Sequence, residues 1–387
     1  AIICAIISWL TCVSAQNNAF TDVVDLIMAA NQQVVLDTDE KKVELMERQA
    51  DNILSPAEIG GSYEFGTKGV GNKIGADITQ SFDWPGVYAA RRKAISNQAA
   101  AIEQYKEGRM RDLRMEISLA LIDYVSVKRV MALRLDVYQR VSEAEKHYTT
   151  AFRHGEATIL DLNKVKIARL DAMRNLSDIR NQLSAAESAL LVLASGRELK
   201  DVLARVDTFA LQSIKPLEYY NNEAKSTDPK LRHLELSAKT AALDVTSAKR
   251  SNLPGFTLGI THMNELGSHF NGVKVGVTLP SYGGKHKVAA ARMAAESAAI
   301  QYTNAQIDRL SQISANYHNA MRMHDELQQY EALVMDHSVM EILQKALDGG
   351  EITVINYLEE LNFFTEARIS YEGMLREYAA ALTRLNR

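Results

Sequence analysis

The sequence has almost no cysteine. Its two cysteines, Cys4 and Cys12, both lie within the first fifteen of its 387 residues. This distribution excludes a disulfide framework in the remaining chain, and an exported protein of that kind needs no oxidative folding. The sequence is therefore compatible with the bacterial cell envelope.

Proline is also scarce. Two long stretches, 86–215 and 281–387, contain none. Because proline removes a backbone donor and breaks helix interiors, both stretches are free to be helical. The six prolines lie at the borders of predicted strands or between the two halves of the chain, at 56, 85, 216, 229, 254 and 280.

Neither sign of charge dominates the chain, and familiar catalytic motifs are missing. The net charge is −4, and the basic residues are dispersed among acidic ones, so a nucleic-acid partner is not expected. There is no Gly-rich phosphate loop, no His-Glu-x-x-His and no serine turn between a strand and a helix. We therefore predict a protein that is not an enzyme and uses no cofactor.

The first fifteen residues resemble a secretory signal peptide. An apolar run is followed by small residues at Val13 and Ala15, and the run is too short to span a bilayer. The charged start of such a peptide is missing, so we expect the true initiator to lie upstream. A buried first helix is one alternative. A lipid-anchored Cys12 is another, although Trp9 stands where such signals usually have leucine.

Two ordered landmarks recur along the chain and predict a tandem duplication. The spacing from Pro56 to Gly86 equals that from Pro254 to Gly284. The turn sequence at 155–161 recurs at 350–356, about three residues out of that register. We predict a first repeat at 16–195, a linker at 196–227 and a second repeat at 228–387.

Each repeat is predicted to contain a very long helix followed by a second helix. Apolar residues recur at three- and four-residue steps, and the first long helix, 87–153, would measure about 100 Å at 1.5 Å per residue. Long soluble coiled coils have helices of this length and are the alternative to be kept. The predicted helices are 20–52, 87–153, 158–195, 228–252, 285–347 and 353–385.

Short turns join the paired helices into hairpins. Gly155 and Gly350 suit the left-handed residue that commonly closes a helix. Thr158 and Thr353 suit the N-cap position that opens the next helix. The sequence therefore predicts two helical hairpins with related turns.

Two β-hairpins, 58–83 and 255–280, are predicted from alternating apolar and polar residues. Such strands suit lipid on one face and water on the other, although a sheet half-buried on a soluble core gives the same alternation. Four strands cannot close a barrel, and open edges are not tolerated in lipid, so several copies must contribute. Aromatic residues at the strand ends would form an interfacial girdle: Phe82, Trp84, Phe256 and Tyr282.

These features resemble the TolC-like outer-membrane efflux proteins over nearly the whole chain. The resemblance rests on the duplicated element order, on the Phe-Asp-Trp-Pro-Gly stretch at 82–86 and on the two Gly-Glu-x-Thr turns. It implies a mainly α fold with a small β part. It also implies a homotrimer with a 12-stranded outer-membrane barrel, a periplasmic helical barrel, a periplasmic adaptor and an inner-membrane pump.

The resemblance also implies two groups of functional residues. Asn356 and Glu359 match acidic family positions at the closed periplasmic mouth, with asparagine replacing the first acid; Asp161 and Lys164 hold the same places in the first repeat and are candidates for pairing across the mouth. An ordinary solvated face is the alternative. The turns themselves would meet the adaptor through Gly155, Glu156, Gly350 and Glu351.

A run rich in methionine and histidine in the second long helix offers weak metal candidates, His318, Met321 and His324. Thioether and imidazole ligands suit copper or silver, but helical methionine more often fills a core. His262, Met263 and His269, near the second β-hairpin loop, are weaker candidates still.

The leading functional hypothesis is a passive exit duct of a tripartite efflux system for small molecules or metal cations. A duct for type I protein secretion and a soluble periplasmic coiled-coil scaffold are the alternatives. A passive duct leaves substrate selection to its pump, so the substrate is not predicted.

Overall fold

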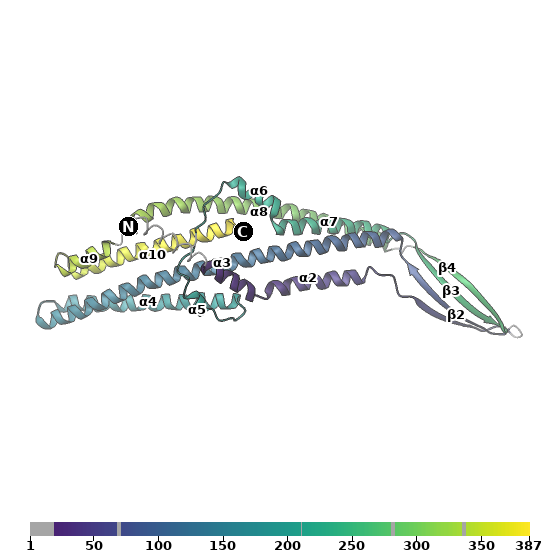
Figure 1. The fold of residues 1–387 in the computed structure, drawn as a ribbon, viewed down its shortest axis with the longest axis horizontal. Coiled ribbons are helices and arrows are strands. Elements are labelled where there is room, and N and C mark those ends of the chain that lie inside the picture. Colours follow the sequence, from purple (N-terminus) through teal and green to yellow (C-terminus); the bar gives the residue numbers. More distant parts are fainter. Residues whose placement is uncertain (1–18, 68–70, 210, 280–282, 335–337) are drawn as a thin grey trace, which may run out of the picture. The chain divides into compact units, whose positions relative to one another are not determined.

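A computed structural model describes residues 19–67, 71–209, 211–279, 283–334 and 338–387. The predicted signal peptide with its two cysteines and the predicted girdle residue Tyr282 lie outside these ranges. The described chain is mainly helical with one four-stranded antiparallel sheet (Figure 1). The predicted fold class is therefore confirmed.

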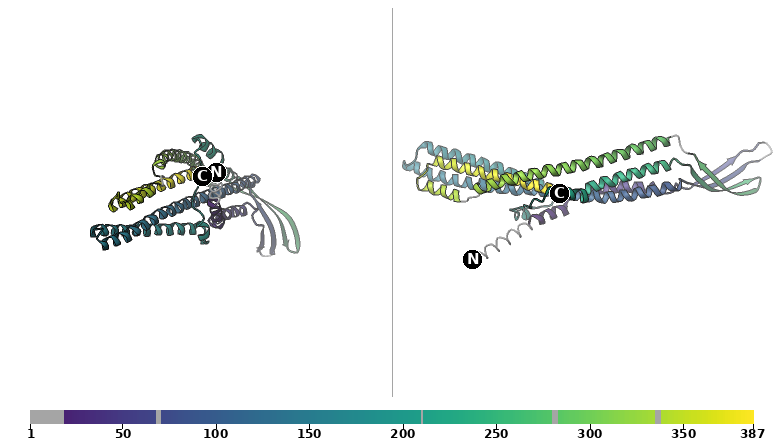
Figure 2. Two further views of the ribbon diagram at one scale, coloured as in Figure 1. Left: turned by 60° about the vertical axis from the view of Figure 1, so that its left-hand side comes forward. Right: turned by 90° about the horizontal axis from the view of Figure 1, so that it is seen from above.

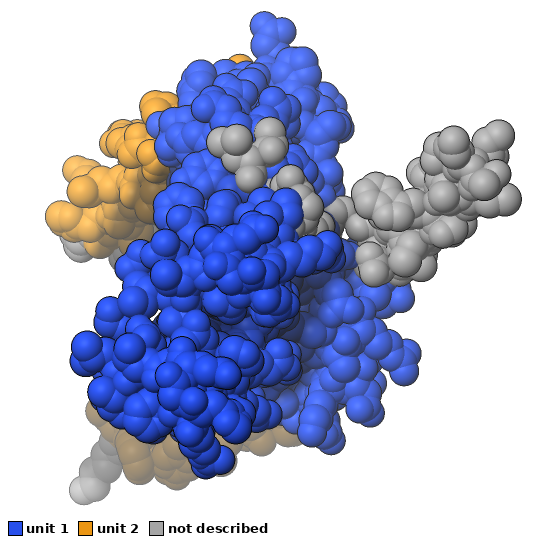
Figure 3. Space-filling model, turned by 90° about the vertical axis from the view of Figure 1, so that its left-hand side faces the viewer, with its two compact units in different colours: residues 1–32, 110–222, 310–387 blue, residues 33–109, 223–309 orange. Residues whose placement is uncertain are grey.

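The chain forms two compact units, each built from both halves of the sequence (Figure 3). Unit 1 comprises residues 1–32, 110–222 and 310–387, and unit 2 comprises 33–109 and 223–309. The units therefore divide the chain differently from the predicted repeats. The long helices α3 (Pro85–His154) and α8 (Gly284–Val334) contribute to both units.

Unit 2 contains the sheet. Its strands are β1 (Glu58–Glu64), β2 (Lys73–Phe82), β3 (Gly255–Glu265) and β4 (Ser268–Thr278). They pair in the order β1-β2-β3-β4, so the two predicted hairpins join along β2 and β3. Figure 2 shows the strands side by side. The sheet consequently ends on β1 at one edge and β4 at the other.

The helices of unit 2 are tied together by ion pairs. Helix α2 (Gln33–Ala50) bonds to α3 through Asp37 and Arg109, 2.9 Å apart, and to α7 (Pro229–Arg250) through Arg48 and Asp244. Burial raises the pKa of Asp244, opposed by Arg48.

Unit 1 contains the two helical hairpins. One pairs α3 with α4 (Ile159–Leu193), and the other pairs α9 (Ser338–Asp348) with α10 (Val354–Leu385). Helix α10 also packs against α8 through buried Ala320, Leu327, Tyr371 and Tyr378. A series of ion pairs crosses from α3 to α10: Asp123 with Arg376, Arg129 with Glu372, and Arg134 with Glu366.

Several predicted helix bounds differ in the structure. The predicted helix at 20–52 is interrupted at 31–32, where the Asn31 amide donates to the Leu193 carbonyl at 2.8 Å. In the stretch 285–347 the structure describes α8 up to Val334 and α9 from Ser338, and residues 335–337 lie outside the described ranges. The helix expected at 228–252 starts at Pro229 because Asp228 caps it.

The segment predicted as a linker also contains helices. These are α5 (Lys200–Leu203) and α6 (Leu217–Thr227). The segment is anchored in unit 1 because Lys128 donates to the carbonyls of Ala204 and Val206. Within the described residues, no helix is long and apolar enough to cross a membrane.

Candidate functional site

The two hairpin turns of unit 1 have the same backbone geometry. Gly155 and Gly350 adopt φ values of +77° and +73°. At each turn the residue after the glycine donates to a carbonyl five positions back, Glu156 to Ala151 and Glu351 to Ala346, both at 2.9 Å. This is the Schellman pattern that closes a helix with a left-handed residue. The four predicted tip residues are all exposed at these turns.

The helices that follow the two turns both begin at a threonine N-cap, but only α4 has the two reciprocal bonds of a capping box. Thr158 accepts from the backbone of Asp161, and the Asp161 carboxylate accepts from Thr158 in return, which completes a capping box. Thr353 likewise accepts from the backbone of Asn356 at 3.2 Å. Asn356 thus occupies the position of Asp161 in the second repeat.

Two of the four predicted gate residues, Asp161 and Asn356, take part in these caps. In the described chain the Asp161 carboxylate accepts hydrogen bonds from the backbone and the hydroxyl of Thr158. Among the described residues, no bond joins Asp161 to the second repeat. Asn356 and Glu359 lie one turn apart and are exposed on α10, and Lys164 is exposed on α4. Their roles in a gate therefore stay predictions.

The hairpins contact each other just beyond the turns. Tyr357 of α10 is 1% exposed and packs with Val141 of α3 and Leu361. Val354 packs against Ala144 and Val165 in a second cluster. This apolar contact holds the first turn of α10 against both helices of the first hairpin.

The buried Tyr357 also joins a polar network with partly exposed neighbours. Its hydroxyl donates to Gln344 Oε1 at 2.8 Å and bonds to Arg140, which in turn pairs with Asp136 at 2.8 Å. Burial raises the pKa of Tyr357, and the opposing effect of Arg140 does not cancel it. The hydroxyl is therefore neutral and both donates and accepts a hydrogen bond.

A second tyrosine bridges the hairpins close by. The side chain of Tyr148, on α3, forms a hydrogen bond with the backbone of Val354. Burial and the nearby Asp161 carboxylate raise the pKa of Tyr148. Sequence reasoning missed both tyrosines. The available signal was that Tyr357 stands where the first repeat has Leu162, and both are buried.

A groove of about 430 Å³ lies between the hairpins, bordered by α3, α4 and α10. Its floor is apolar and includes Val137, Ala172 and Leu361. Its rim is polar and charged, with Arg134, Asp171, Arg174, Asn175, Asp178 and Asn362.

In unit 2, one face of the sheet is apolar and exposed. Ile59, Ile78, Ile260 and Val273 lie opposite one another and form a row across all four strands. The two edge residues of this row, Ile59 and Val273, are 81% and 77% exposed. Leu258 and Val275 form part of the next row. Nothing in the described chain covers this face.

The opposite face of the sheet is polar and small. Asp77 of β2 pairs with Lys274 of β4 at 3.1 Å across β3, and Ser81 lies 3.2 Å from Thr257. A Cβ added at Gly75 would approach the Ser62 hydroxyl to 2.5 Å, and one at Gly259 would meet Thr79 at 2.7 Å. This face therefore has room only for small residues at these positions.

The predicted girdle residues that are described lie where the sheet meets the helices. Phe82 and Phe256 are opposite each other, and the Trp84 ring lies 5.7 Å from that of Phe256. Trp84 is 40% exposed. Amphipathic rings at the end of an apolar band are typical of a membrane interface.

The metal candidates of α8 are not gathered into a site. His318 is exposed, whereas His324 contacts Tyr378 and Gln328. No cluster of three or more histidine, cysteine or acidic residues with metal-binding geometry occurs among the described residues.

The structure matches solved outer-membrane channels over nearly its full length. It superposes on the Campylobacter jejuni CmeC outer membrane channel with a TM-score of 0.77 and 15% identity, covering 95% of this chain and 84% of that one. The chain has the fold of these channels. Vibrio cholerae VceC matches with a TM-score of 0.74 and 12% identity, covering 96% and 95% of the chains.

The outer-membrane-channel fold is also shared with the open state of the Neisseria gonorrhoeae MtrE channel. That match has a TM-score of 0.72 at 13% identity and covers 95% of this chain and 87% of that one. No protein-family model and no curated protein gives a match. The predicted resemblance to TolC-like proteins is thus confirmed through the fold.

Proposed function

We propose that this chain is one protomer of a trimeric outer-membrane exit duct in a tripartite efflux system. Three copies would supply twelve strands for a closed barrel, and their helical hairpins would extend into the periplasm. An inner-membrane pump and a periplasmic adaptor would deliver small molecules or metal cations. The duct itself would be passive.

The observation that carries this proposal is the uncovered apolar row from Ile59 to Val273 on a sheet with two open edges. Exposed apolar surface of this extent is unfavourable in water and favourable in lipid. Open edges are unfavourable in lipid, so β1 of one copy must pair with β4 of the next. The match to solved outer-membrane channels supports the placement of this sheet in the outer membrane.

Disulfide cross-linking in native outer membranes tests the trimer. Glu58 of β1 pairs with Thr79 near the end of β2, and Thr278 of β4 pairs with Gly255 at the start of β3. Both residues therefore lie at the same end of the sheet. Cysteines at Glu58 and at either Gly276 or Thr278 are expected to yield cross-linked dimers and trimers on oxidation. Glu58→Cys alone is the control and should yield neither.

Recovery only as monomers would contradict the trimer. Recovery of the chain in the soluble periplasmic fraction would instead favour the coiled-coil scaffold. A scaffold has no need for the apolar face of the sheet.

We further propose that the exposed turns meet the adaptor. Gly155 and Gly350 leave open space around them, since an added Cβ would meet nothing within 4 Å. Tryptophan at both positions should therefore block a partner without disturbing neighbouring side chains. We expect export to be lost while trimers still assemble; normal export would count against this contact.

The periplasmic gate is the third part of the proposal. Exposed Glu359, present once per copy, would face the axis of a trimer and attract cations. Tyr357 and Val354 hold this turn of α10 against the first hairpin. Opening would then require the adaptor to favour a splayed state by a few kcal/mol.

A further inference from the structure

A cluster of imidazole and amide side chains interrupts the apolar face of the sheet near the β3–β4 turn. His262 and Asn264 follow Ile260 on the same face of β3, and Asn271 and His269 lie opposite them on β4. All four belong to the face that carries Val273 and Val275. The apolar face therefore ends in a group of potential metal ligands.

The two histidine rings of this cluster are close together. Their centroids are 5.5 Å apart with an interplanar angle of 22°. Two imidazoles bound to one ion at about 2.0–2.1 Å, at a tetrahedral angle, have centroids about 5 Å apart. Both side chains are exposed, so packing does not prevent the two rings from turning toward a common ion.

One hydrogen bond orients the His262 ring for metal binding. The Nδ1 atom of His262 lies 2.8 Å from Asn271 Oδ1. Because the amide oxygen only accepts, Nδ1 carries the proton, and the lone pair of a neutral ring is left on Nε2. Histidine ligands of metals are usually oriented in this way by an oxygen acceptor on the second ring nitrogen.

The charge of the surroundings favours a cation over an anion. The cluster contains no lysine or arginine, and the strand cation Lys73 pairs with Glu265 on the opposite face at 3.1 Å. Neutral imidazoles and amides would bind a phosphate group weakly. They are, however, good ligands for late divalent transition metals, with copper(II) bound most tightly.

We propose that His262 and His269 form a surface site for a divalent transition-metal ion, with His262 positioned by Asn271. The two imidazole nitrogens supply two ligands, and water completes the coordination. The site itself is independent of the proposed transport function. Only its placement at the outer rim of the barrel rests on that proposal.

Copper(II) titration of the full chain, without an affinity tag, tests the site. Electron paramagnetic resonance is expected to show one ion per chain with two coordinating nitrogens. His262→Gln and His269→Gln should each reduce the signal to at most one nitrogen and weaken binding at least roughly ten-fold. The double variant should bind copper(II) no more weakly than either single variant, because either change alone removes the two-histidine chelate.

Two further variants make the test specific. Asn271→Leu should keep two nitrogens but weaken binding about ten-fold, since it removes only the orienting acceptor. His318→Gln, on an exposed face of α8, is the matched control and should bind as the parent does. A two-nitrogen signal that survives in both His262→Gln and His269→Gln, or that disappears in His318→Gln, would overturn the proposal.

Discussion

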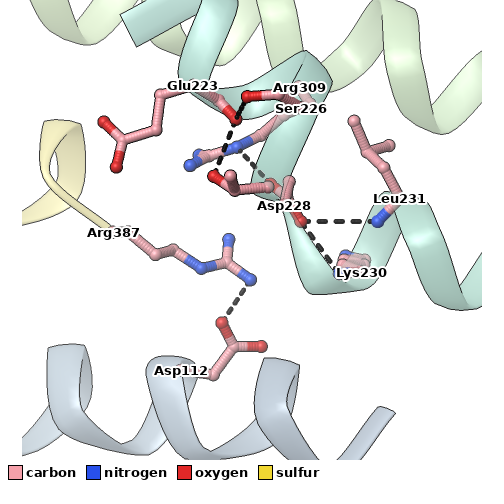
Figure 4. A network of polar contacts seen from close by, with 9 residues as sticks. Asp112, Glu223, Ser226, Asp228, Lys230, Leu231, Arg309 and Arg387 are labelled. Carbon is pink, nitrogen blue, oxygen red and sulfur yellow. Dashed lines mark hydrogen bonds and ion pairs between the residues drawn. The ribbon is translucent and has the colours of Figure 1, made fainter. Parts of the chain in front are cut away.

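Arg309 of α8 and Asp228 form an ion pair in which both side chains are about nine-tenths buried. Nε and Oδ2 are 2.9 Å apart, and the side chains are 10% and 12% exposed. Asp228 also caps α7 by accepting from the backbone of Lys230 and Leu231 (Figure 4). One carboxylate thus starts a helix and neutralises a buried guanidinium within unit 2.

The first prediction separates these two tasks of Asp228. Asp228→Asn keeps an N-cap oxygen but removes the charge opposite buried Arg309, and should lower the free energy of unfolding by about 3 kcal/mol. Asp228→Ala also removes the cap and should cost about 1 kcal/mol more. Urea unfolding in detergent measures both.

The control for this pair is Arg322→Ala, also in α8. Arg322 pairs with Glu326 at the surface, with 62% and 48% of the side chains exposed. Its loss should change stability by less than about 0.5 kcal/mol. Equal losses of unfolding free energy for the Asp228 and Arg322 variants would show that burial does not strengthen the ion pair between Asp228 and Arg309.

The second prediction concerns the left-handed glycines of the turns. Gly155→Ala and Gly350→Ala should each lower stability by about 1 kcal/mol through backbone strain alone, because no atom lies near the new Cβ. Gly373, inside α10, also has open space around it. Gly373→Ala should instead raise stability by about 0.5–1 kcal/mol, and thermal unfolding distinguishes the signs.

The third prediction is a loss of stability at alkaline pH that depends on Tyr357. Its pKa is raised by burial, so the folded state retains a proton that the unfolded state releases near pH 10. Stability is full below that pH and falls as pH rises toward the higher folded pKa. Tyr357→Phe should reduce this alkaline loss. At neutral pH it should cost about 1 kcal/mol, from its bond to Gln344.

The fourth prediction tests which face of the sheet meets lipid. Val273→Lys places a charge in the apolar row and should cost about 2–4 kcal/mol in a membrane, reducing insertion into lipid vesicles. Thr261→Lys, on the polar face of β3, should insert normally. Equal insertion of the two variants would contradict the assignment of the faces.

The fifth prediction addresses the gate. Glu359→Gln should lower the cation selectivity of channels in planar bilayers, because it removes one negative charge per copy from the proposed mouth. Its neighbour Glu360 is also exposed on α10 but points about 100° away around the helix. Glu360→Gln should leave selectivity unchanged; equal effects would place the selectivity elsewhere.

The structure also changes how a gate mutant should be chosen. Asp161 completes the capping box with Thr158, so Asp161→Ala would weaken the start of α4 whatever its role in a gate. Lys164→Ala avoids this problem because Lys164 is exposed beyond the cap. A rise in resting conductance from Lys164→Ala would support the proposed pairing across the mouth.

Local patterns in the sequence determined the elements of this protein. Alternating residues such as Phe256, Leu258 and Ile260 specify a strand with two unlike faces, because successive side chains point to opposite sides. Gly155 and Thr158 specify a turn between helices, because few other residues suit a left-handed closure and an N-cap. These signals act over a few residues and can be read without knowing the fold.

Contacts between distant segments were decided only by the tertiary structure. Strands β2 and β3 are joined by no short turn, so the pairing of Ile78 with Ile260 left no local signal. The same holds for Tyr357, whose bonds to Arg140 and Gln344 depend on how two hairpins pack. Asp161 remains a candidate for pairing with the second repeat, and in the structure its carboxylate accepts hydrogen bonds from Thr158. Sequence periodicity specifies which face of an element is apolar, but only tertiary packing determines which distant residues that face contacts.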